Sequence, residues 1–220
     1  MSKFKIITFL LLILLISCKN DSEEKTVSKP ETEESAEDKN EEINFSTIEN
    51  QTLENWKKYY QTMDSAFNLA EFEFVSTSDL ESMKGSVHAK YEEEFDTIYN
   101  NFLIYSPSKE KYLDIDSYYW QIKEEEGKDE ILYAADQEIN VIDLQDSTIH
   151  RIAFRGPSFT VEDAYWKDEN QVVLLEGTYE SSPNINVIDL EKEKIYSYSY
   201  PDTLNKRSLY TDKRIKEKIE

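Results

Sequence analysis

A six-residue sequence, INVIDL, occurs twice in this chain, at residues 139–144 and 46 residues further on at 185–190. Each copy is followed by four polar residues and a second apolar or aromatic run. This order is typical of two antiparallel strands joined by a tight turn. The same offset relates three further residues of one unit to three of the next, namely Tyr119, Trp120 and Ile149 to Tyr165, Trp166 and Ile195. The agreement predicts a duplicated β unit.

The region 103–205 is expected to be built from these units, at about 111–154 and 157–200. Several other short runs in it have the composition of strands. Each unit resembles one blade of a β-propeller, whose closed forms contain about four or more blades. Because the chain holds two units, we expect an open twisted sheet instead of a closed ring.

Residues 44–102 are predicted to be helical. Leu53, Trp56, Tyr60 and Met63 recur at helical spacing on one face. A second apolar stripe runs from Leu80 to Phe102 and begins at a capping box, Ser-Asp-Leu-Glu at 78–81. The predicted fold class is therefore α+β, mainly antiparallel β, with two N-terminal helices packed on the sheet.

Residues 1–17 have the pattern of a secretion signal, with two lysines before the apolar run 6–16. The run ends in Leu-Ile-Ser-Cys, which resembles the lipobox of bacterial lipoproteins. That resemblance implies cleavage before Cys18, the one cysteine of the chain, and its modification with diacylglycerol and a further fatty acyl chain such as palmitate. Two or more buried acyl chains anchor a protein stably, whereas one chain is marginal. Cys18 is thus the predicted lipidation site.

Residues 18–43 join the lipidated cysteine to the domain through an acidic, polar segment that we expect to be a disordered linker. Residues 19–24, KNDSEE, are similar to the Lys-plus-acidic signals that direct lipoproteins of Bacteroidota to the cell surface; ordinary linker composition is the alternative. The expected localisation is the cell envelope, lipid-anchored, in the outer membrane or on the cell surface.

The β region also resembles small lipoproteins of Bacteroidota over roughly residues 102–190. The segments that carry the resemblance are 105–107 (YSP), 114–118 (DIDSY), 136–138 (DQE), 155–158 (RGPS) and 162–166 (EDAYW). The resemblance implies a location in the cell envelope and a β fold, and it implies no activity.

Charge and composition exclude several function classes. The formal net charge of −21 repels phosphate, so no nucleic-acid partner is expected. One cysteine and two histidines leave little for a transition-metal site, and four glycines leave little for a phosphate-binding loop. We therefore predict no cofactor, no metal and no catalytic residue.

The best candidates for ligand binding are Asp114 and Asp116 with the adjacent Ser117 and Tyr118. Two carboxylates two residues apart on a strand face the same side and could act as an acid and base pair or hold Ca²⁺, although the further oxygen ligands and the glycine of an EF-type calcium loop are missing. Two solvated carboxylates on an exposed strand are the alternative. Arg155, before Gly-Pro, could bind an anion or simply flank a turn.

These features favour an envelope lipoprotein whose β domain binds a protein or glycan partner without catalysis, attached to the membrane through its lipid. The alternatives are a hydrolase that uses Asp114 and Asp116, and a structural subunit of an envelope complex. The basic segment 206–220 is expected to dock on the acidic domain or to end a short helix.

Overall fold

A computed structural model describes residues 43–86, 97–125, 128–178, 182–204 and 209–219. The predicted signal peptide, Cys18 and the linker as far as residue 42 lie outside the described residues. The elements are η1 (Phe45–Thr47), α1 (Gln51–Gln61), η2 (Leu69–Glu71), β1 (Glu73–Asp79), β2 (Met83–Lys84), η3 (Thr97–Phe102), β3 (Ile104–Tyr105), β4 (Lys111–Asp114), β5 (Trp120–Glu125), β6 (Lys128–Tyr133), β7 (Gln137–Asp143), β8 (Thr148–Arg155), β9 (Thr160–Trp166), β10 (Gln171–Gly177), β11 (Asn184–Asp189), β12 (Lys194–Ser199) and α2 (Tyr210–Ile219).

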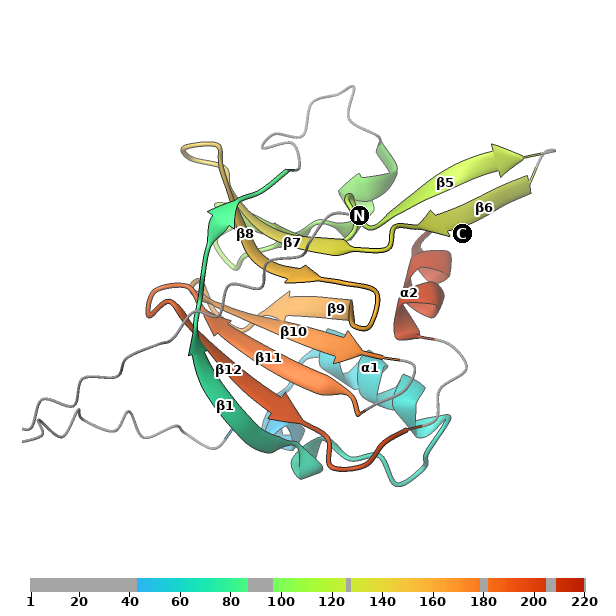
Figure 1. Ribbon diagram of the computed structural model, residues 1–220, viewed down its shortest axis with the longest axis vertical. Coiled ribbons are helices and arrows are strands. Elements are labelled where there is room, and N and C mark those ends of the chain that lie inside the picture. Colours follow the sequence, from blue (N-terminus) through green and yellow to red (C-terminus); the bar gives the residue numbers. More distant parts are fainter. Residues whose placement is uncertain (1–42, 87–96, 126–127, 179–181, 205–208, 220) are drawn as a thin grey trace, which may run out of the picture. The chain divides into compact units, whose positions relative to one another are not determined.

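The strands form two five-stranded sheets and a two-stranded ribbon (Figure 1). Sheet A has the order β1-β12-β11-β10-β9, sheet B has the order β2-β8-β7-β4-β3, and β5 pairs with β6 in the ribbon. All pairings among the described strands are antiparallel, which confirms the predicted mainly antiparallel β class.

The prediction of one open sheet is wrong, because the chain leaves sheet B after β8 and begins sheet A with β9. The break falls at a turn in which the amide of Phe159 donates to the carbonyl of Gly156. Pro157 lies in this turn and has no amide hydrogen to continue a ladder, so the strand ends before it.

The two INVIDL segments form β7 and β11, which pair with β8 and β12 as predicted hairpins. The register is the same in both, with Ile142 opposite Ile149 in one hairpin and Ile188 opposite Ile195 in the other. Each hairpin is the second and third strand of its five-stranded sheet, counted from the edges β2 and β1.

The likeness extends to the backbone of the two turns. Ser147 has a φ of 60° and Glu193 a φ of 53°, and these residues are again 46 positions apart. The offset does not extend to the aromatic dipeptides, because Trp120 begins β5 in the ribbon whereas Trp166 ends β9 at an edge of sheet A.

Sheets A and B enclose one apolar core between their facing surfaces. Because strand side chains alternate between faces, one face of β4, β7, β8, β9, β10 and β11 supplies its buried side chains. Its strand members are Leu113, Ile139, Val141 and Ile152 from sheet B and Val161, Ala164, Trp166, Val172, Leu174 and Ile188 from sheet A, and Leu80 and Ile115 join it from outside the strands.

The other face of sheet A is covered by α1, as predicted for the first helix (Figure 1). The Asn50 side chain caps the helix by accepting from the amide of Leu53 at 3.1 Å. Leu53, Trp56 and Tyr60 are buried against the sheet, which is the face that their spacing predicted. Met63 lies beyond the end of α1 and is exposed.

The second predicted helix is wrong for residues 78–86, and residues 87–96 lie outside the described residues. The supposed capping serine, Ser78, lies in β1 opposite Ile195, and β2 pairs with β8. Each of these short segments gains backbone hydrogen bonds at the edge of a sheet, which outweighs a weak local helix pattern that contains Gly85. Near the predicted end of that helix, residues 97–102 form η3.

The C-terminal segment forms α2, which packs against β9 and η3. Ile215 is fully buried with Trp120, Tyr99 and Phe102, and the ribbon residues Ile122 and Ile131 lie against this small cluster. The predicted basic tail therefore places Leu209, Tyr210 and Ile215, together with Thr211 and Arg214, inside the domain.

Candidate functional site

Asp114 is the carboxylate that shapes the turn after β4. It accepts hydrogen bonds from the amides of Asp116 and Ser117, both at 3.0 Å, and from the hydroxyl of Ser117. Burial raises the pKa of Asp114, although the bonds from Ser117 and Asp116 act in the opposite direction. Its oxygens are thus used to hold the turn.

Asp116 is held by a buried arginine. The two terminal nitrogens of Arg214 donate to its two oxygens at 2.9 and 2.7 Å, and the indole nitrogen of Trp120 donates at 2.8 Å. The side chains of Arg214 and Asp116 are 3% and 1% exposed. Burial alone would lower the pKa of Arg214, but Asp116 and Asp163 raise it above its usual value. This bidentate pair is charged, desolvated and fixed in orientation.

The other predicted ligand-binding residues separate into two places. Ser117 and Tyr118 line a hollow of about 270 Å³ beside the ribbon. Arg155 lies on β8 and forms an ion pair with Glu176 at 2.7 Å. The structure therefore brings Asp114, Asp116 and Ser117 together in one turn, while Arg155 joins sheet B to sheet A through Glu176.

A second buried carboxylate, Glu162, connects α1, β9 and α2. It accepts from Trp56 Nε1 at 2.8 Å, from the Tyr60 hydroxyl at 2.6 Å and from the amide of Tyr210 at 2.6 Å. Its backbone carbonyl accepts from Arg214 Nε at 2.7 Å. The two helices that flank β9 are thereby linked through one residue.

The sequence makes room for Glu162 in two ways. The pairing of β9 with β10 shifts register so that Val161 faces Glu176 and Asp163 faces Leu175, which leaves Glu162 in a β-bulge. Gly177 then provides space, because a Cβ there would lie 2.4 Å from the carboxyl carbon of Glu162. The bulge and the glycine both accommodate the buried carboxylate of Glu162. The irregular pairing of β9 is therefore a specific structural feature and not fraying at the edge of the sheet.

Asp163 follows the bulge, and its carboxylate faces Arg214 and Lys218. One of its oxygens accepts from the amide of Ala164 at 2.9 Å, and the side chain is 8% exposed. Burial raises the pKa of Asp163 against the opposing effect of Arg214. Burial, followed by repulsion from Arg214, lowers the pKa of Lys218. Perturbed groups of this kind gather at functional sites more often than elsewhere.

Asp163 lies in a hollow of about 500 Å³, which we call the Asp163 pocket. Its wall is built by α1, β3, β9 and α2, which come from separate parts of the chain. The polar and aromatic members of the lining are Thr52, Asn55, Tyr105, Asp163, Tyr210, Arg214, Glu217 and Lys218. Two carboxylates and two cations make the lining neutral overall, so the pocket suits an uncharged polar molecule.

The chemistry of the pocket is that of hydrogen bonding and ring contact. It offers an amide, hydroxyls, a carboxylate and an ammonium together with the exposed ring of Tyr105. Among the described residues, no group of three His, Cys, Asp or Glu side chains could hold a metal ion.

Sequence reasoning selected Asp116 but missed its partner and the pocket. The sequence did contain a signal for Arg214, since arginine occurs four times in this acidic chain. A scarce residue with five fixed donors is well suited to a buried carboxylate. No comparable signal marked Asp163, because its significance depends on burial under α2 and on the bulge in β9.

Comparison of the chain with protein-family models, with curated proteins and with solved structures found no match. In the described part of the chain, no helix is both long and apolar enough to cross a membrane.

Proposed function

We propose that this chain is a lipid-anchored protein of the cell envelope whose β domain binds a saccharide, without catalysis, in the Asp163 pocket. The observation that carries the proposal is a nearly buried carboxylate at a pocket lined by polar groups and two tyrosines. Pockets of about 300–1,000 Å³ with a few convergent polar groups are the usual form of small-ligand sites.

A saccharide agrees with the lining better than a charged ligand does. Sugar hydroxyls both donate and accept, and Asp163, Asn55 and Thr52 supply acceptors and donors for them. Tyr105, which is 44% exposed, offers an apolar ring with a polar tip, which suits a sugar ring that is apolar on one face and polar at its rim. The neutral balance of the lining charges disfavours a strongly anionic or cationic ligand.

Binding is favoured over the alternative of an acid and base hydrolase by the engagement of the two candidate carboxylates. Asp116 is paired with Arg214, and Asp114 is bonded to Ser117 and to the turn amides. A general acid and base must reach a substrate atom with a free oxygen.

The envelope address is proposed from the lipobox at Cys18 and from the apolar run before it. Acyl chains on Cys18 would hold the domain at the outer membrane, and the acidic linker would keep it away from the lipid head groups. The similarity of residues 19–24 to a surface signal supports display at the cell surface, where glycans are available.

We also propose that sheets A and B are two blade-like repeats derived by duplication of one hairpin. Support comes from the shared hexapeptide, the shared register and the paired left-handed residues Ser147 and Glu193.

The saccharide proposal is tested by binding of residues 19–220 to a panel of neutral oligosaccharides built from glucose, galactose, mannose and N-acetylglucosamine. We expect a member of the panel to bind, and Tyr105→Ala combined with Asn55→Ala to weaken that binding at least about tenfold. Tyr118→Ala is the matched control, because Tyr118 is exposed to a similar degree as Tyr105 but lies outside the pocket. No binding by the intact protein, or equal loss in the control, would contradict the proposal.

A further inference from the structure

A serine and a histidine lie within hydrogen-bonding distance beside the core between sheets A and B. Ser82 Oγ is 3.4 Å from His150 Nδ1, and both side chains line a pocket of about 440 Å³, which we call the Ser82 pocket. We propose that this pocket is an esterase site, in which Ser82 is the nucleophile and His150 is the general base. The site shares no lining residue with the Asp163 pocket, and it departs from the expectation that the chain holds no catalytic residue.

Hydrogen bonds fix the orientation of His150. Its Nε2 atom lies 3.2 Å from Thr148 Oγ1, and that hydroxyl donates to Asp146 Oδ1 at 2.6 Å. With its hydrogen on Nε2, the histidine donates to Thr148, and the lone pair of Nδ1 accepts from Ser82. The charges of Asp146 and His150 interact, so Asp146 stabilises the imidazolium that forms when the serine proton is transferred. A nucleophile, a base and an orienting group in this order activate a serine.

The sheet topology places the two side chains together. Ser82 directly precedes β2, in which Lys84 is opposite His150 of β8. Side chains two residues apart in an extended chain face the same side, so Ser82 is a diagonal neighbour of His150. Leu80 is buried in the core between the sheets, and its amide donates to the carbonyl of Glu193 at 2.8 Å. The short segment that carries Ser82 is therefore fixed at both ends.

The duplicated hairpin shows that these polar residues are not needed to form the turn or the strands. At 192, 194 and 196, the positions that correspond to Asp146, Thr148 and His150, the second copy has lysine, lysine and tyrosine. The register of the two hairpins is nonetheless the same. The bonded series of aspartate, threonine and histidine is therefore particular to the copy that has Ser82 beside it, which favours a chemical role.

The inner lining of the Ser82 pocket is apolar. Leu80, Val141 and Ile152 belong to the core between the sheets, and Leu190 packs against that core. An acyl chain that enters the pocket is removed from water by these aliphatic side chains, which is favourable. The carbonyl group of an ester then lies at the polar side of the pocket, beside Ser82.

Charge selects an uncharged ester as the substrate. The charged members of the lining are Lys111, Asp143 and Glu193, two carboxylates against one ammonium group. A neutral ester avoids repulsion by these carboxylates, whereas the carboxylate that hydrolysis releases is repelled and leaves. Lys111 supplies the positive charge that stabilises the negative oxygen developing on the carbonyl group.

The reaction consists of two acyl transfers. Ser82 Oγ forms a bond to the acyl carbon as its proton moves to His150 Nδ1, and the bond from the acyl carbon to the alcohol oxygen breaks as that oxygen takes the proton. Water then attacks the acyl-serine and gives a proton to Nδ1. The bond between Ser82 and the acyl carbon breaks, the proton returns to Ser82, and a carboxylic acid is released.

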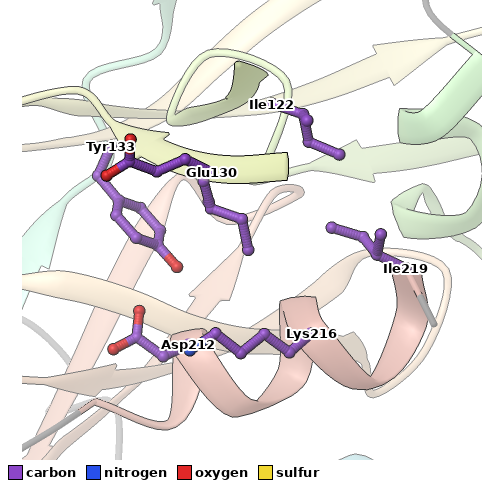
Figure 2. Close-up of a pocket in the computed structure, with 7 residues that line it drawn as sticks. Ile122, Glu130, Tyr133, Asp212, Lys216 and Ile219 are labelled. Atoms are coloured by element: carbon purple, nitrogen blue, oxygen red, sulfur yellow. The ribbon is translucent and has the colours of Figure 1, made fainter. Parts of the chain in front are cut away.

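A larger hollow, of about 750 Å³ between the ribbon and α2, has different chemistry. Its polar side chains are Glu130, Tyr133, Asp212 and Lys216, and the described residues that line it include neither serine nor histidine (Figure 2). The Tyr133 hydroxyl is bonded to Asp212. A nucleophile beside a base is thus found in the smaller Ser82 pocket and not in this larger hollow.

The experiment is covalent labelling of residues 19–220 by an alkyl fluorophosphonate, with the modified residue located by peptide mass analysis. In this reaction Ser82 Oγ bonds to phosphorus, fluoride leaves and His150 takes the proton. We expect labelling at Ser82 and none there in Ser82→Ala. The rate should fall at least about tenfold in His150→Gln. Thr148→Val should also slow labelling, and Thr148→Ser, which keeps the hydroxyl, should restore it.

Ser108→Ala is the matched control. Ser108 is an exposed serine whose hydroxyl donates to a carboxylate, that of Glu169 at 2.9 Å, instead of to a histidine. This variant should be labelled at Ser82 as fast as the unchanged protein. No labelling at Ser82, equal labelling of Ser108, or an unchanged rate in His150→Gln would overturn the proposal.

Hydrolysis of p-nitrophenyl esters tests the acyl site. We expect kcat/KM for the butanoate to exceed that for the acetate by about threefold or more, because two further methylene groups are buried. Ser82→Ala should hydrolyse neither ester above the spontaneous rate. Equal kcat/KM values for the two esters, or full activity in Ser82→Ala, would contradict the assignment of this pocket.

Discussion

At the scale of single residues, Arg214 joins parts of the domain that are distant in sequence. It is bonded to Asp116, 98 residues earlier, and to the carbonyl of Glu162, 52 residues earlier. A cation buried in this way stabilises the fold only while its partner is present, because each charge alone would be left without water. Arg214 also lines the Asp163 pocket.

We predict that Arg214→Met lowers the free energy of unfolding by about 3–5 kcal/mol, because Asp116 is left as an unpaired buried charge. The control is Lys213→Met, which breaks an exposed pair with Glu217 and should cost no more than about 0.5 kcal/mol. Urea unfolding measures both. The double variant Asp116→Asn, Arg214→Met should recover part of the loss; a loss in Arg214→Met no larger than in the control would contradict a structural ion pair.

The raised pKa of Asp163 leads us to expect that the stability of the fold depends on pH. Burial raises its pKa in the folded state, so its contribution to stability is present below the unfolded pKa and is lost as pH rises through the folded pKa. Asp163→Asn should therefore gain stability relative to the unchanged protein as the pH rises from about 3 to about 7.

The matched control is Asp146→Asn, for which we expect the opposite change of stability with pH. Hydrogen bonds from Thr148 lower the pKa of the exposed Asp146, so its contribution is present above the unfolded pKa and is lost as pH falls through the folded pKa. Asp146→Asn should lose stability relative to the unchanged protein over the same rise in pH. Urea unfolding at a series of pH values measures both slopes, and equal slopes would contradict this account of Asp163.

At the scale of elements, the turns of the two duplicated hairpins share a left-handed backbone conformation that is unfavourable for residues with a side chain. Ser147 and Glu193 have positive φ at corresponding places in the two turns. For residues with a Cβ this region costs about 1–2 kcal/mol, and glycine avoids the cost.

We predict that glycine is better tolerated at Glu193 than at its neighbour Lys192 by about 1 kcal/mol or more. Glu193→Gly relieves the left-handed strain, whereas Lys192→Gly only adds flexibility to the unfolded chain. Ser147→Gly should behave like Glu193→Gly if the two hairpins are equivalent. Thermal unfolding of the three variants gives the comparison; a larger loss at Glu193 than at Lys192 would show that the turn is not strained there.

The elements that were predicted correctly are those determined by a pattern of neighbouring residues in the sequence. The hairpins follow from the duplicated hexapeptide, and α1 follows from Leu53, Trp56 and Tyr60 at helical spacing. The second helix failed because residues 78–86 pair with strands more than sixty residues away, at Ile195 and His150. The candidate site was found only in part. Alternating apolar and acidic residues selected Asp114 and Asp116 as strand residues, but β4 ends at Asp114 and both carboxylates are buried. Arg214 reaches Asp116 only through the complete fold.

At the scale of the whole molecule, we propose that an acidic binding domain is attached to a membrane through one lipidated cysteine. The linker and Cys18 lie outside the described residues, and the lipid is proposed from sequence. Negative charge on the domain and linker would hold both away from anionic lipid surfaces, so attachment depends on the acyl chains.

We predict that Cys18→Ala moves the protein from the membrane fraction to the soluble or secreted fraction, because no thiol remains to carry lipid. Ser22→Ala, in the linker, is the control and should stay with membranes. Fractionation after a salt wash, with intact-mass analysis of the mature chain, measures both. A Cys18→Ala protein that still sediments with membranes would argue against lipidation.

The measurement that tests binding in the Asp163 pocket most directly is mapping of amide chemical shifts on addition of each neutral oligosaccharide that the panel retains. The proposal predicts that the largest changes fall at Asn55, Asp163, Ala164 and Tyr210, around the carboxylate under α2. Changes centred on the hollow at Tyr118 and Gln121, or on the hollow at Ile122 between the ribbon and α2, with none near Asp163, would contradict it.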